Sequence, residues 1–403
     1  MNAADTAFVV VCSALVLVMT PGLAMFYGGL TRAKNVLSTM MHSFFLMGLA
    51  SILWVVYAYS LSFGTDIGGV IGGLNHFMAA GVGAEVKEGL TIPHTIFLAF
   101  QGMFVIITPA LISGAIAERM KFSSFALFTI LWITIVYAPI CHWVWGGGWL
   151  NKLGILDFAG GTVVHLNCGI ASLVAAIVVG RRKGYGTRAF IPHNLTLTLL
   201  GIGLLWFGWF GFNAGSRLAA DGVACNAFLV THIAAATGAM TWTLAEWYLK
   251  EKPTSLGFAS GAVAGLGSIT PACGFVDTTA ALVIGGVAGV ICYLAVLSKE
   301  RLGYDDSLDV VGIHGVGGVW GTLATGLFAS KLINPEGNDG LFFGNPSLLG
   351  IQALGVLATI LYCAIATVVI LYVVKAILGL RVTEDEEEVG VDTSAHGEVG
   401  YTW

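Results

Sequence analysis

Long apolar runs dominate the chain, and eleven of them reach the roughly 20 residues that a helix needs to cross a bilayer. Charged residues make up only 10% of the chain, which is too few to cover a water-facing surface, since soluble domains carry roughly 25%. The sequence therefore predicts an all-α polytopic membrane protein. The eleven predicted spans cover residues 6–30, 37–63, 94–117, 123–146, 158–180, 193–213, 223–248, 256–272, 278–298, 309–330 and 347–378.

Composition excludes several other classes of protein. With 18 Lys and Arg and a net charge of −5, the chain has no basic surface for nucleic acid. Its seven cysteines lie mostly inside apolar runs without C-x-x-C spacing, which excludes a disulfide scaffold. Its 55 glycines suit closely packed transmembrane helices. The first run has no positive flank before Arg32, so we interpret it as a span and not a signal peptide, although a leader removed earlier stays open.

Basic residues divide unequally between the two sets of alternate loops. One set, with the C-terminal flank, holds 14 of them and the other holds 4, which accounts for all 18. Because Lys and Arg concentrate in cytoplasmic loops, we expect the N-terminus outside and the C-terminus in the cytoplasm of a cell-membrane protein. The larger set is Arg32, Lys34, Arg119, Lys121, Arg181, Arg182, Lys183, Arg188, Lys250, Lys252, Lys299, Arg301, Lys375 and Arg381, and the smaller is Lys87, Lys152, Arg217 and Lys331.

The composition changes after residue 380. Residues 384–388 form an acidic run, and the segment has too little apolar surface to fold alone. The ordinary interpretation of such a run is a solvated tail. We therefore divide the chain into a transmembrane domain, residues 1–380, and a cytoplasmic tail, residues 381–403.

Two segments of the chain resemble each other. The fifth span carries Asp157 and His165, the tenth carries Asp309 and His314, and each continues as a stripe of Gly, Ala, Ser and Thr. Because five spans separate them, the two helices cross in opposite directions, which indicates an inverted repeat of spans 1–5 and 6–10 with span 11 added. At ~1.5 Å per residue, both histidines approach the bilayer midplane, where such folds place their substrate site.

Other polar and aromatic residues in or beside the spans allow more than one interpretation. Trp143, Trp145 and Trp149 at the end of the fourth span suit either an interfacial aromatic belt or a cation–π site for a small ammonium ion. Asp157 and Asp309 suit helix N-caps, although a carboxylate near the outer surface also favours an approaching cation. Motifs of soluble enzymes are absent. No role is assigned to His42, His94, His142, His193 and His232.

The chain resembles the bacterial and archaeal branch of the Amt/Mep/Rh family of ammonium transporters, from near residue 6 to the tail. The motifs that carry the resemblance are MTPGLAMFYGGL, FQGMF, HWVWGGGWL, DFAGGTVVHLNCGIASLV, GWFGFNAGS, DDSLDVVGIHGVGG and, in the tail, AHGEVGY.

The resemblance implies roles for individual residues. Trp145, Phe104 and Ser216 are similar to an outer recruitment site for ammonium, and Asp157 resembles the buried carboxylate that organises this site. Phe104 and Phe212 resemble a stacked phenyl gate. His165 and His314 resemble the twin histidines of a narrow hydrophobic pore, one pore in each subunit of a homotrimer. The resemblance also implies ammonium uptake as a nitrogen source, methylammonium as an analogue, and inhibition by a PII-type signalling protein at the cytoplasmic face. It implies no cofactor and no catalytic residues.

Two alternatives stay open at this point. One is a membrane-embedded metalloenzyme using His142, His165 and His314, although the chain lacks the ligand spacing expected of a catalytic metal site. The other is an ammonium sensor that binds without conducting. The sequence also leaves open whether NH3, NH4+, or NH3 with a separate proton crosses the membrane.

Overall fold

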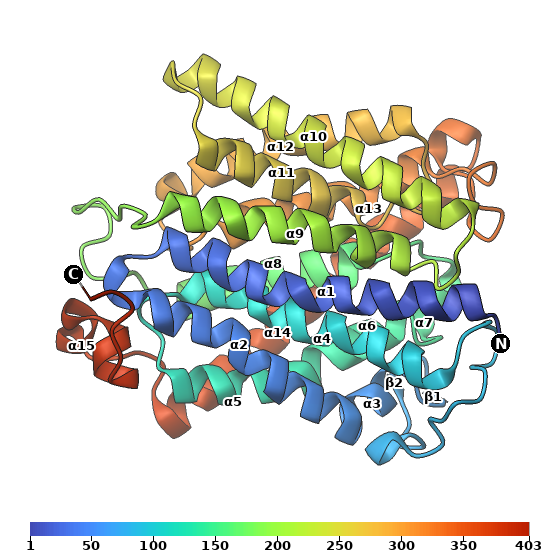
Figure 1. Cartoon of the computed structure of the whole chain (residues 1–403), viewed down its shortest axis with the longest axis horizontal. Helices are drawn as coiled ribbons and strands as arrows, with labels where there is room; N and C mark the ends of the chain where they lie inside the picture. Colours follow the sequence, from blue (N-terminus) through green and yellow to red (C-terminus); the bar gives the residue numbers. More distant parts are fainter. Residues whose placement is uncertain (403) are drawn as a thin grey trace.

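The computed structural model describes residues 1–402, and in it nearly all helices run roughly along one common direction (Figure 1). The N-terminus lies at one end of this bundle, and α15 and the end of the chain lie at the other; we call these the N-terminal end and the tail end. The long helices are α1 (Ala3–Leu30), α2 (Val36–Leu53), α4 (His94–Ile116), α5 (Phe122–Trp132), α8 (Asn167–Val179), α9 (Leu195–Gly215), α10 (Gly222–Lys250), α11 (Ser255–Ile269), α12 (Thr278–Leu302), α13 (Val316–Phe328) and α14 (Pro346–Leu378).

A helix lies at each of the eleven predicted ranges, often within one to three residues of the predicted ends. In the described part of the chain, nine helical segments are long and apolar enough to cross a membrane. The remaining two are α11, which is only 15 residues long, and Val311–Phe328. The chain is thus a mostly helical protein with nine candidate spans, and the count of eleven stays a prediction.

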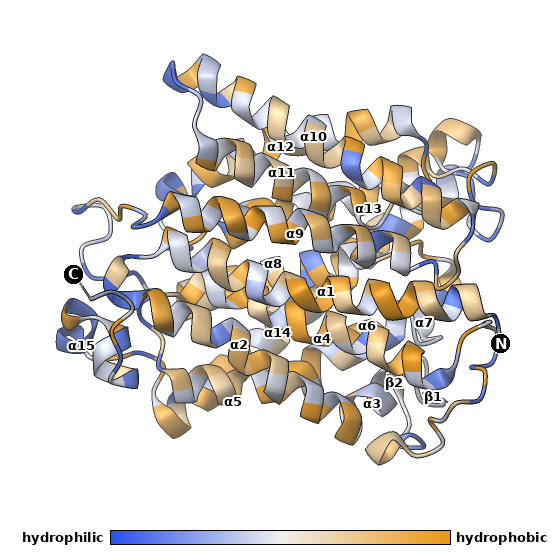
Figure 2. Ribbon diagram, viewed as in Figure 1, coloured by the Kyte–Doolittle hydropathy of each residue, from blue (hydrophilic) through white to orange (hydrophobic). Residues whose placement is uncertain are grey.

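Apolar side chains cover the outside of the bundle as well as its core. Leu200 on α9, Leu244 on α10 and Ile365 on α14 are all exposed. Figure 2 shows hydrophobic residues along the helices and hydrophilic residues gathered in the connections and in α15. A surface of this kind suits contact with lipid, because a water-soluble protein rarely exposes so large an apolar area.

Packing divides the helices into groups. α1 lies along α9, and α10 packs against both α11 and α12. α14 packs against α5, α8 and α13, so the last long helix contacts both halves of the chain. These contacts are compatible with the predicted inverted repeat, which stays a prediction.

Several of these helices contain a π-helical turn, in which each backbone hydrogen bond spans five residues instead of four. Such turns often mark a functional site. Trp54–Ala58 joins α2 to α3 (Tyr59–Phe63), and Ile133–Tyr137 joins α5 to α6 (Ala138–Val144). The turn Gly161–Leu166 precedes α8 and carries His165, and the turn Val311–Gly315 precedes α13 and carries His314. Both predicted pore histidines therefore lie in π-helical turns.

Short elements at the N-terminal end were not predicted. Strands β1 (Asp66–Ile67) and β2 (Ile71–Gly72) pair antiparallel, with Asp66 opposite Gly72, and α7 (Trp149–Leu153) follows the end of α6. The hairpin and α7 contact each other through the backbone, since the Trp149 N–H donates to the carbonyl of Gly69 over 2.9 Å.

The tail is folded against the rest of the protein instead of being a solvated appendage. α15 (Glu384–Val389) begins with a capping box formed by Thr383 and Glu386, and a π-helical turn follows at Asp392–His396. Glu387 is 1% exposed, and it accepts hydrogen bonds from Arg381 and from the backbone N–H of Lys183. The segment has too little apolar surface to fold alone, and its polar groups find partners on other parts of the chain.

Candidate functional site

His165 and His314 contact each other at the centre of the bundle. Their Nδ1 atoms lie 3.1 Å apart, and their rings are nearly parallel, with centroids separated by 5.2 Å. Both side chains are buried. Trp209 on α9 stacks on the other side of the His165 ring at 5.3 Å. The Nε2 atom of His165 has no hydrogen-bond partner among the described residues, so it is free to contact a small molecule.

Close contact between two backbones brings the histidines together. Gly169 on α8 faces Gly315, the residue after His314, and a methyl group at Gly169 would collide with the backbone of Gly315. Glycine at position 169 therefore allows the two helices to approach this closely, whereas a methyl group at Gly315 would lie 3.5 Å from the Gly169 Cα, an ordinary contact.

Each histidine-bearing turn also begins in the same way. Asp157 accepts hydrogen bonds from the backbone N–H groups of Gly160, Gly161 and Thr162, and from the Thr162 hydroxyl. Asp306 accepts from the N–H of Val311, five residues on, as Asp157 does from Thr162. In each segment the histidine follows eight residues after this aspartate. The counterpart of Asp157 is thus Asp306, whereas the sequence comparison had matched Asp157 with Asp309, which instead forms an ion pair with Lys299.

The space beside the two histidines is narrow and almost wholly apolar. A cavity of about 10 Å³, scarcely the volume that one water molecule needs, lies along the imidazole rings. Apart from the imidazoles, its lining is apolar and aromatic, and it holds no carboxylate: Met19, Leu23, Phe26, Ile107, Leu111, Val164, Leu205, Trp209, Phe212 and Val263.

A second, wider cavity of about 260 Å³ opens at the N-terminal end and is lined by Trp145, Phe104, Ser216 and Asp157. The Phe104 ring contacts Trp145 edge-on at 5.7 Å and lies 4.5 Å from Phe212, measured between centroids. The Phe212 ring lies 6.1 Å from His165. The predicted recruitment, gate and pore residues therefore form one continuous series of side chains.

Two polar contacts arrange this cavity. The indole N–H of Trp145 donates to the backbone carbonyl of Asp157 over 2.8 Å. The Asp157 carboxylate itself points back into its own turn, so helix capping, the ordinary interpretation, accounts for its contacts. The Ser216 hydroxyl donates to the carbonyl of Phe212, which leaves its oxygen lone pairs available to a hydrogen-bond donor.

Several residues of the site were not predicted from the sequence. Gln101, Phe158 and Phe275 line the same cavity, and the buried Oε1 atom of Gln101 has no partner among the described residues. Gln101 and Trp209 both lie inside motifs that were recognised, FQGMF and GWFGFNAGS, but nothing in the sequence distinguishes which ring or amide turns inward. Asp306 could have been found from the shared spacing of eight residues to the histidine.

The structure does not bring the three histidines of the metalloenzyme alternative together. His142 contacts the carbonyl of Ser62 and the carboxylate of Asp66, away from the His165–His314 pair. Within residues 1–402, no three His, Cys, Asp or Glu side chains are grouped so that they could hold a metal ion.

A cavity of about 780 Å³ opens at the tail end, and Ile313, the residue before His314, is part of its lining. Basic side chains outnumber acidic ones around it: Arg181, Arg182, Arg188 and Lys299 against Glu300 and Asp309. The loop between α8 and α9 supplies the first three of these, and the tail contacts the same loop through Glu387 and Glu388.

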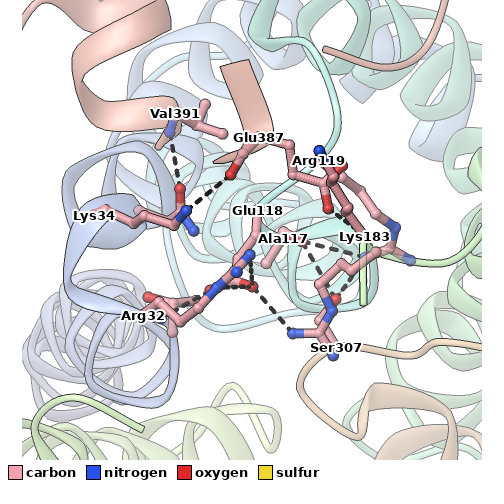
Figure 3. Close-up of polar contacts among 12 residues, drawn as sticks. Arg32, Lys34, Ala117, Glu118, Arg119, Lys183, Ser307, Glu387 and Val391 are labelled. Atoms are coloured by element: carbon pink, nitrogen blue, oxygen red, sulfur yellow. Dashed lines mark hydrogen bonds and ion pairs between the residues drawn. The ribbon is translucent and has the colours of Figure 1, made fainter. Parts of the chain in front are cut away.

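A buried charge cluster supports this end of the bundle (Figure 3). Glu118 pairs with Arg32 at 2.9 Å and with Arg182 at 3.2 Å, and Arg182 also pairs with Asp305 at 2.7 Å. Burial alone would raise the pKa of Glu118, but Arg182 and Arg32 hold it below its usual value. Arg119 is fully buried, and its guanidinium donates to Ser307 and to the backbone carbonyls of Gly180, Ala115 and Asp305. Burial lowers the pKa of Arg119 to about 10.

Together, these features define a class of protein: a helical membrane protein with a cavity at each end and a narrow apolar passage between them, interrupted by two imidazoles. The profile of the Ammonium Transporter Family matches residues 7–401. The chain is 52% identical to an ammonium transporter of Bacillus subtilis, covering 100% of this chain and 99% of that protein. It is 48% identical to the ammonium transporter Amt1 of Archaeoglobus fulgidus, covering all of both chains.

Solved structures of similar proteins have the same fold as this chain. The crystal structure of Mep2 from Saccharomyces cerevisiae superposes with a TM-score of 0.90 at 37% identity, covering 96% of this chain and 88% of that one. A structure titled Sensor Amt Protein superposes with a TM-score of 0.90 at 30% identity, covering 98% of both. The chain belongs to the ammonium transporter family, whose members are membrane transporters.

Proposed function

We propose that this protein takes up ammonium across the cell membrane as a source of nitrogen. NH4+ enters the cavity at the N-terminal end, where Trp145 and Phe104 present aromatic faces and Ser216 presents a hydroxyl oxygen. An aromatic face attracts a small cation by ~0.5–2 kcal/mol. The single observation that carries the proposal is the unbroken series from this cavity through Phe104 and Phe212 to His165 and His314.

The ion loses its proton at the phenyl gate, and the Nε2 atom of His165, unpartnered within residues 1–402, accepts it beside Phe212. A cation at the bilayer centre costs at least ~2.5–3.5 kcal/mol, and the passage beside the histidines holds no carboxylate that would offset this cost. Ammonia is neutral and small, and it can donate to or accept from an imidazole nitrogen. The His165–His314 pair conducts ammonia and relays the proton separately, which excludes potassium because potassium has no proton to give up.

The surrounding arrangement belongs to the same proposal. The N-terminal end faces outward and the tail end faces the cytoplasm, as the distribution of basic residues predicts. Three copies form a homotrimer with one pore each. The tail, residues 381–403, together with the cavity at the tail end, forms the docking surface for a PII-type signalling protein; the contacts of Glu387 and Glu388 with the loop beside that cavity support this part.

A sensor that binds ammonium without conducting it is the second candidate, favoured by the structural similarity to a protein titled as a sensor. Flux separates the two. Proteoliposomes under an ammonium gradient should show a current together with a pH change, with methylammonium as comparator. Binding without flux would assign the chain to the sensors.

A further inference from the structure

His142 is a buried, fully partnered histidine that the proposed transport steps do not use. It lies in the last turn of α6, three residues before Trp145, and its side chain is 0% exposed. Its Nδ1 lies 3.0 Å from the carbonyl oxygen of Ser62 on α3, and its Nε2 lies 2.9 Å from Oδ1 of Asp66 on β1.

The two partners of this ring determine how many protons it carries. A backbone carbonyl only accepts hydrogen bonds, and so does an ionised carboxylate. A neutral imidazole has a single N–H and can satisfy one of the two contacts, whereas an imidazolium satisfies both. The contacts of His142 therefore require a proton on each nitrogen, unless Asp66 is itself protonated.

The surroundings of Asp66 keep its carboxylate ionised. Lys152 on α7 pairs with Oδ2, and the backbone N–H of Gly69 donates to Oδ1 over 2.7 Å. The hydrogen bonds from His142 and Lys152 lower the pKa of Asp66 to about 2. Asp66 thus contacts a basic side chain through each oxygen, His142 from α6 and Lys152 from α7.

The same region holds the backbone on both sides of Trp145. The carbonyl of His142 accepts from the N–H groups of Gly146 and Gly148, which closes the turn after Trp145. On the hairpin side, the carbonyl of Val70 accepts from the indole of Trp143 over 2.8 Å. Asp66 and Val70 belong to the same hairpin. The His142–Asp66 pair and the Trp143–Val70 hydrogen bond therefore attach this hairpin to the end of α6, and Lys152 attaches it to α7.

We infer that His142, held as an imidazolium by Asp66, is a positioning residue that fixes Trp145 in the cavity at the N-terminal end. The inference rests on the proposed function, because it gives Trp145 the task of recruiting ammonium. Loss of the charged pair loosens the hairpin at the end of α6, where the Trp143–Val70 hydrogen bond remains, and Trp145 then no longer keeps a single orientation against Phe104.

Methylammonium uptake into proteoliposomes tests the inference. Asp66→Asn removes the charge while keeping the size of the side chain, and we expect it to weaken apparent affinity with little change in maximal flux. The loss should be about thirtyfold at most, since a misplaced Trp145 forfeits no more than its cation–π contact. Asp66→Glu, which keeps the charge, should restore most of the affinity. Glu88→Gln, an exposed carboxylate at the same end, is the matched control and should leave affinity unchanged.

A double-mutant cycle separates positioning from general damage to the fold. Because Asp66 acts through Trp145, adding Asp66→Asn to Trp145→Leu should weaken affinity no further. Additive losses would overturn the inference. If Trp145→Leu alone leaves affinity unchanged, the proposed recruitment site fails; if Trp145→Leu weakens affinity and Asp66→Asn does not, only the inference about His142 fails.

The protonation state can be measured directly. In the full-length protein at neutral pH, the 15N chemical shifts of the His142 ring should show two protonated nitrogens, and Asp66→Asn should convert the ring to a form with one. A ring with a single N–H in the unmodified protein would overturn the inference.

Discussion

The Nδ1 atoms of His165 and His314 face each other at 3.1 Å across nearly parallel rings. Between two neutral imidazoles, this contact needs one Nδ1–H as donor and one bare Nδ1 as acceptor. The donor ring then has a bare Nε2, and the acceptor ring has its proton on Nε2. The pair therefore offers an acceptor at one end and a donor at the other, which is the arrangement that a proton relay needs.

Removing both imidazoles tests this arrangement. His165→Ala combined with His314→Ala should abolish the ammonium-driven current, or admit potassium as the constriction fills with water. Current and potassium flux in proteoliposomes measure both outcomes. His232→Ala is the control, because this side chain is exposed on α10. Ammonium current at the unmodified level together with full exclusion of potassium would leave the pair a packing feature.

The aromatic cavity makes a separate prediction. Trp145→Leu should lower the apparent affinity for ammonium by about tenfold, and more than it lowers maximal flux, because the variant loses a cation–π contact of ~0.5–2 kcal/mol. Competition by methylammonium against ammonium uptake measures the change. Trp247→Leu, an exposed tryptophan on α10, should have no effect. If affinity and competition are both unaltered, Trp145 belongs to the interfacial aromatic belt.

Much of the helical framework was predictable, because apolar runs of about 20 residues have few alternatives to a membrane-spanning helix. The hairpin at Asp66–Gly72 was not, since two residues in each strand leave no period-2 pattern. The folding of the tail was also missed. The residues that stabilise it, among them Lys34, Asn35 and Lys183, lie more than 200 residues away in the sequence. No local sequence pattern predicts contacts over that separation.

For the site, sequence supplied the residues but not their contacts. His165, His314, Phe104 and Phe212 were singled out through the motifs that contain them, and their rings do lie together. Which aspartate matches Asp157 could not be decided from residue types alone, because Asp305, Asp306 and Asp309 all precede the second histidine. The spacing of eight residues to the histidine, shared with Asp157, favours Asp306, and the hydrogen bond from Val311 to Asp306 confirms this choice.

The glycine contact between the two histidine-bearing helices predicts a stability effect. Gly169→Ala should destabilise the protein by about 1–3 kcal/mol, as overpacking does, because the added methyl group meets the Gly315 backbone, which cannot rotate away. It should also reduce transport by separating the two imidazoles. Thermal unfolding in detergent and uptake in proteoliposomes measure these effects. Gly203→Ala is the matched control, because nothing lies within 4 Å of a methyl group there. Equal unfolding temperatures for the two variants would contradict the role of this contact.

The folded tail predicts that its removal affects the tail end of the bundle. Deleting residues 384–403 removes the partners of Lys34 and Lys183. It also removes Asp392, which caps α2 by accepting from the N–H groups of Leu37 and Ser38. We expect lower transport, or loss of inhibition by a PII protein, and Asp392→Ala alone should reproduce part of the effect. Lys252→Ala, an exposed residue between α10 and α11 and outside the tail, serves as the control. Unchanged transport and unchanged inhibition would show that the docked tail has no influence on the pore.

Asp306 predicts a pH dependence of stability. Burial raises its pKa to about 6, although nearby Lys299 acts in the opposite direction. Between its ordinary pKa near 4 and about 6, the folded protein holds a proton that the unfolded chain has released. Stability from this group is therefore present at low pH, falls as the pH rises through this window, and stays level above it. Asp306→Asn has no proton to lose, and its amide oxygen can still accept from Val311. Thermal unfolding should therefore show that the stability of the variant minus that of the unmodified protein is larger at pH 7.5 than at pH 4.5.

Asp305 provides the opposing control for this measurement. Although burial acts to raise its pKa, the hydrogen bond and charge of Arg182 hold it below the usual value. Its stabilising contribution is therefore present above the ordinary pKa and is lost as the pH falls through the lower folded value. Asp305→Asn should thus be most destabilising near neutral pH, with the difference from the unmodified protein narrowing under acid conditions. If the two variants change in the same direction with pH, the neighbouring carboxylates share their protons and Asp306 does not titrate separately.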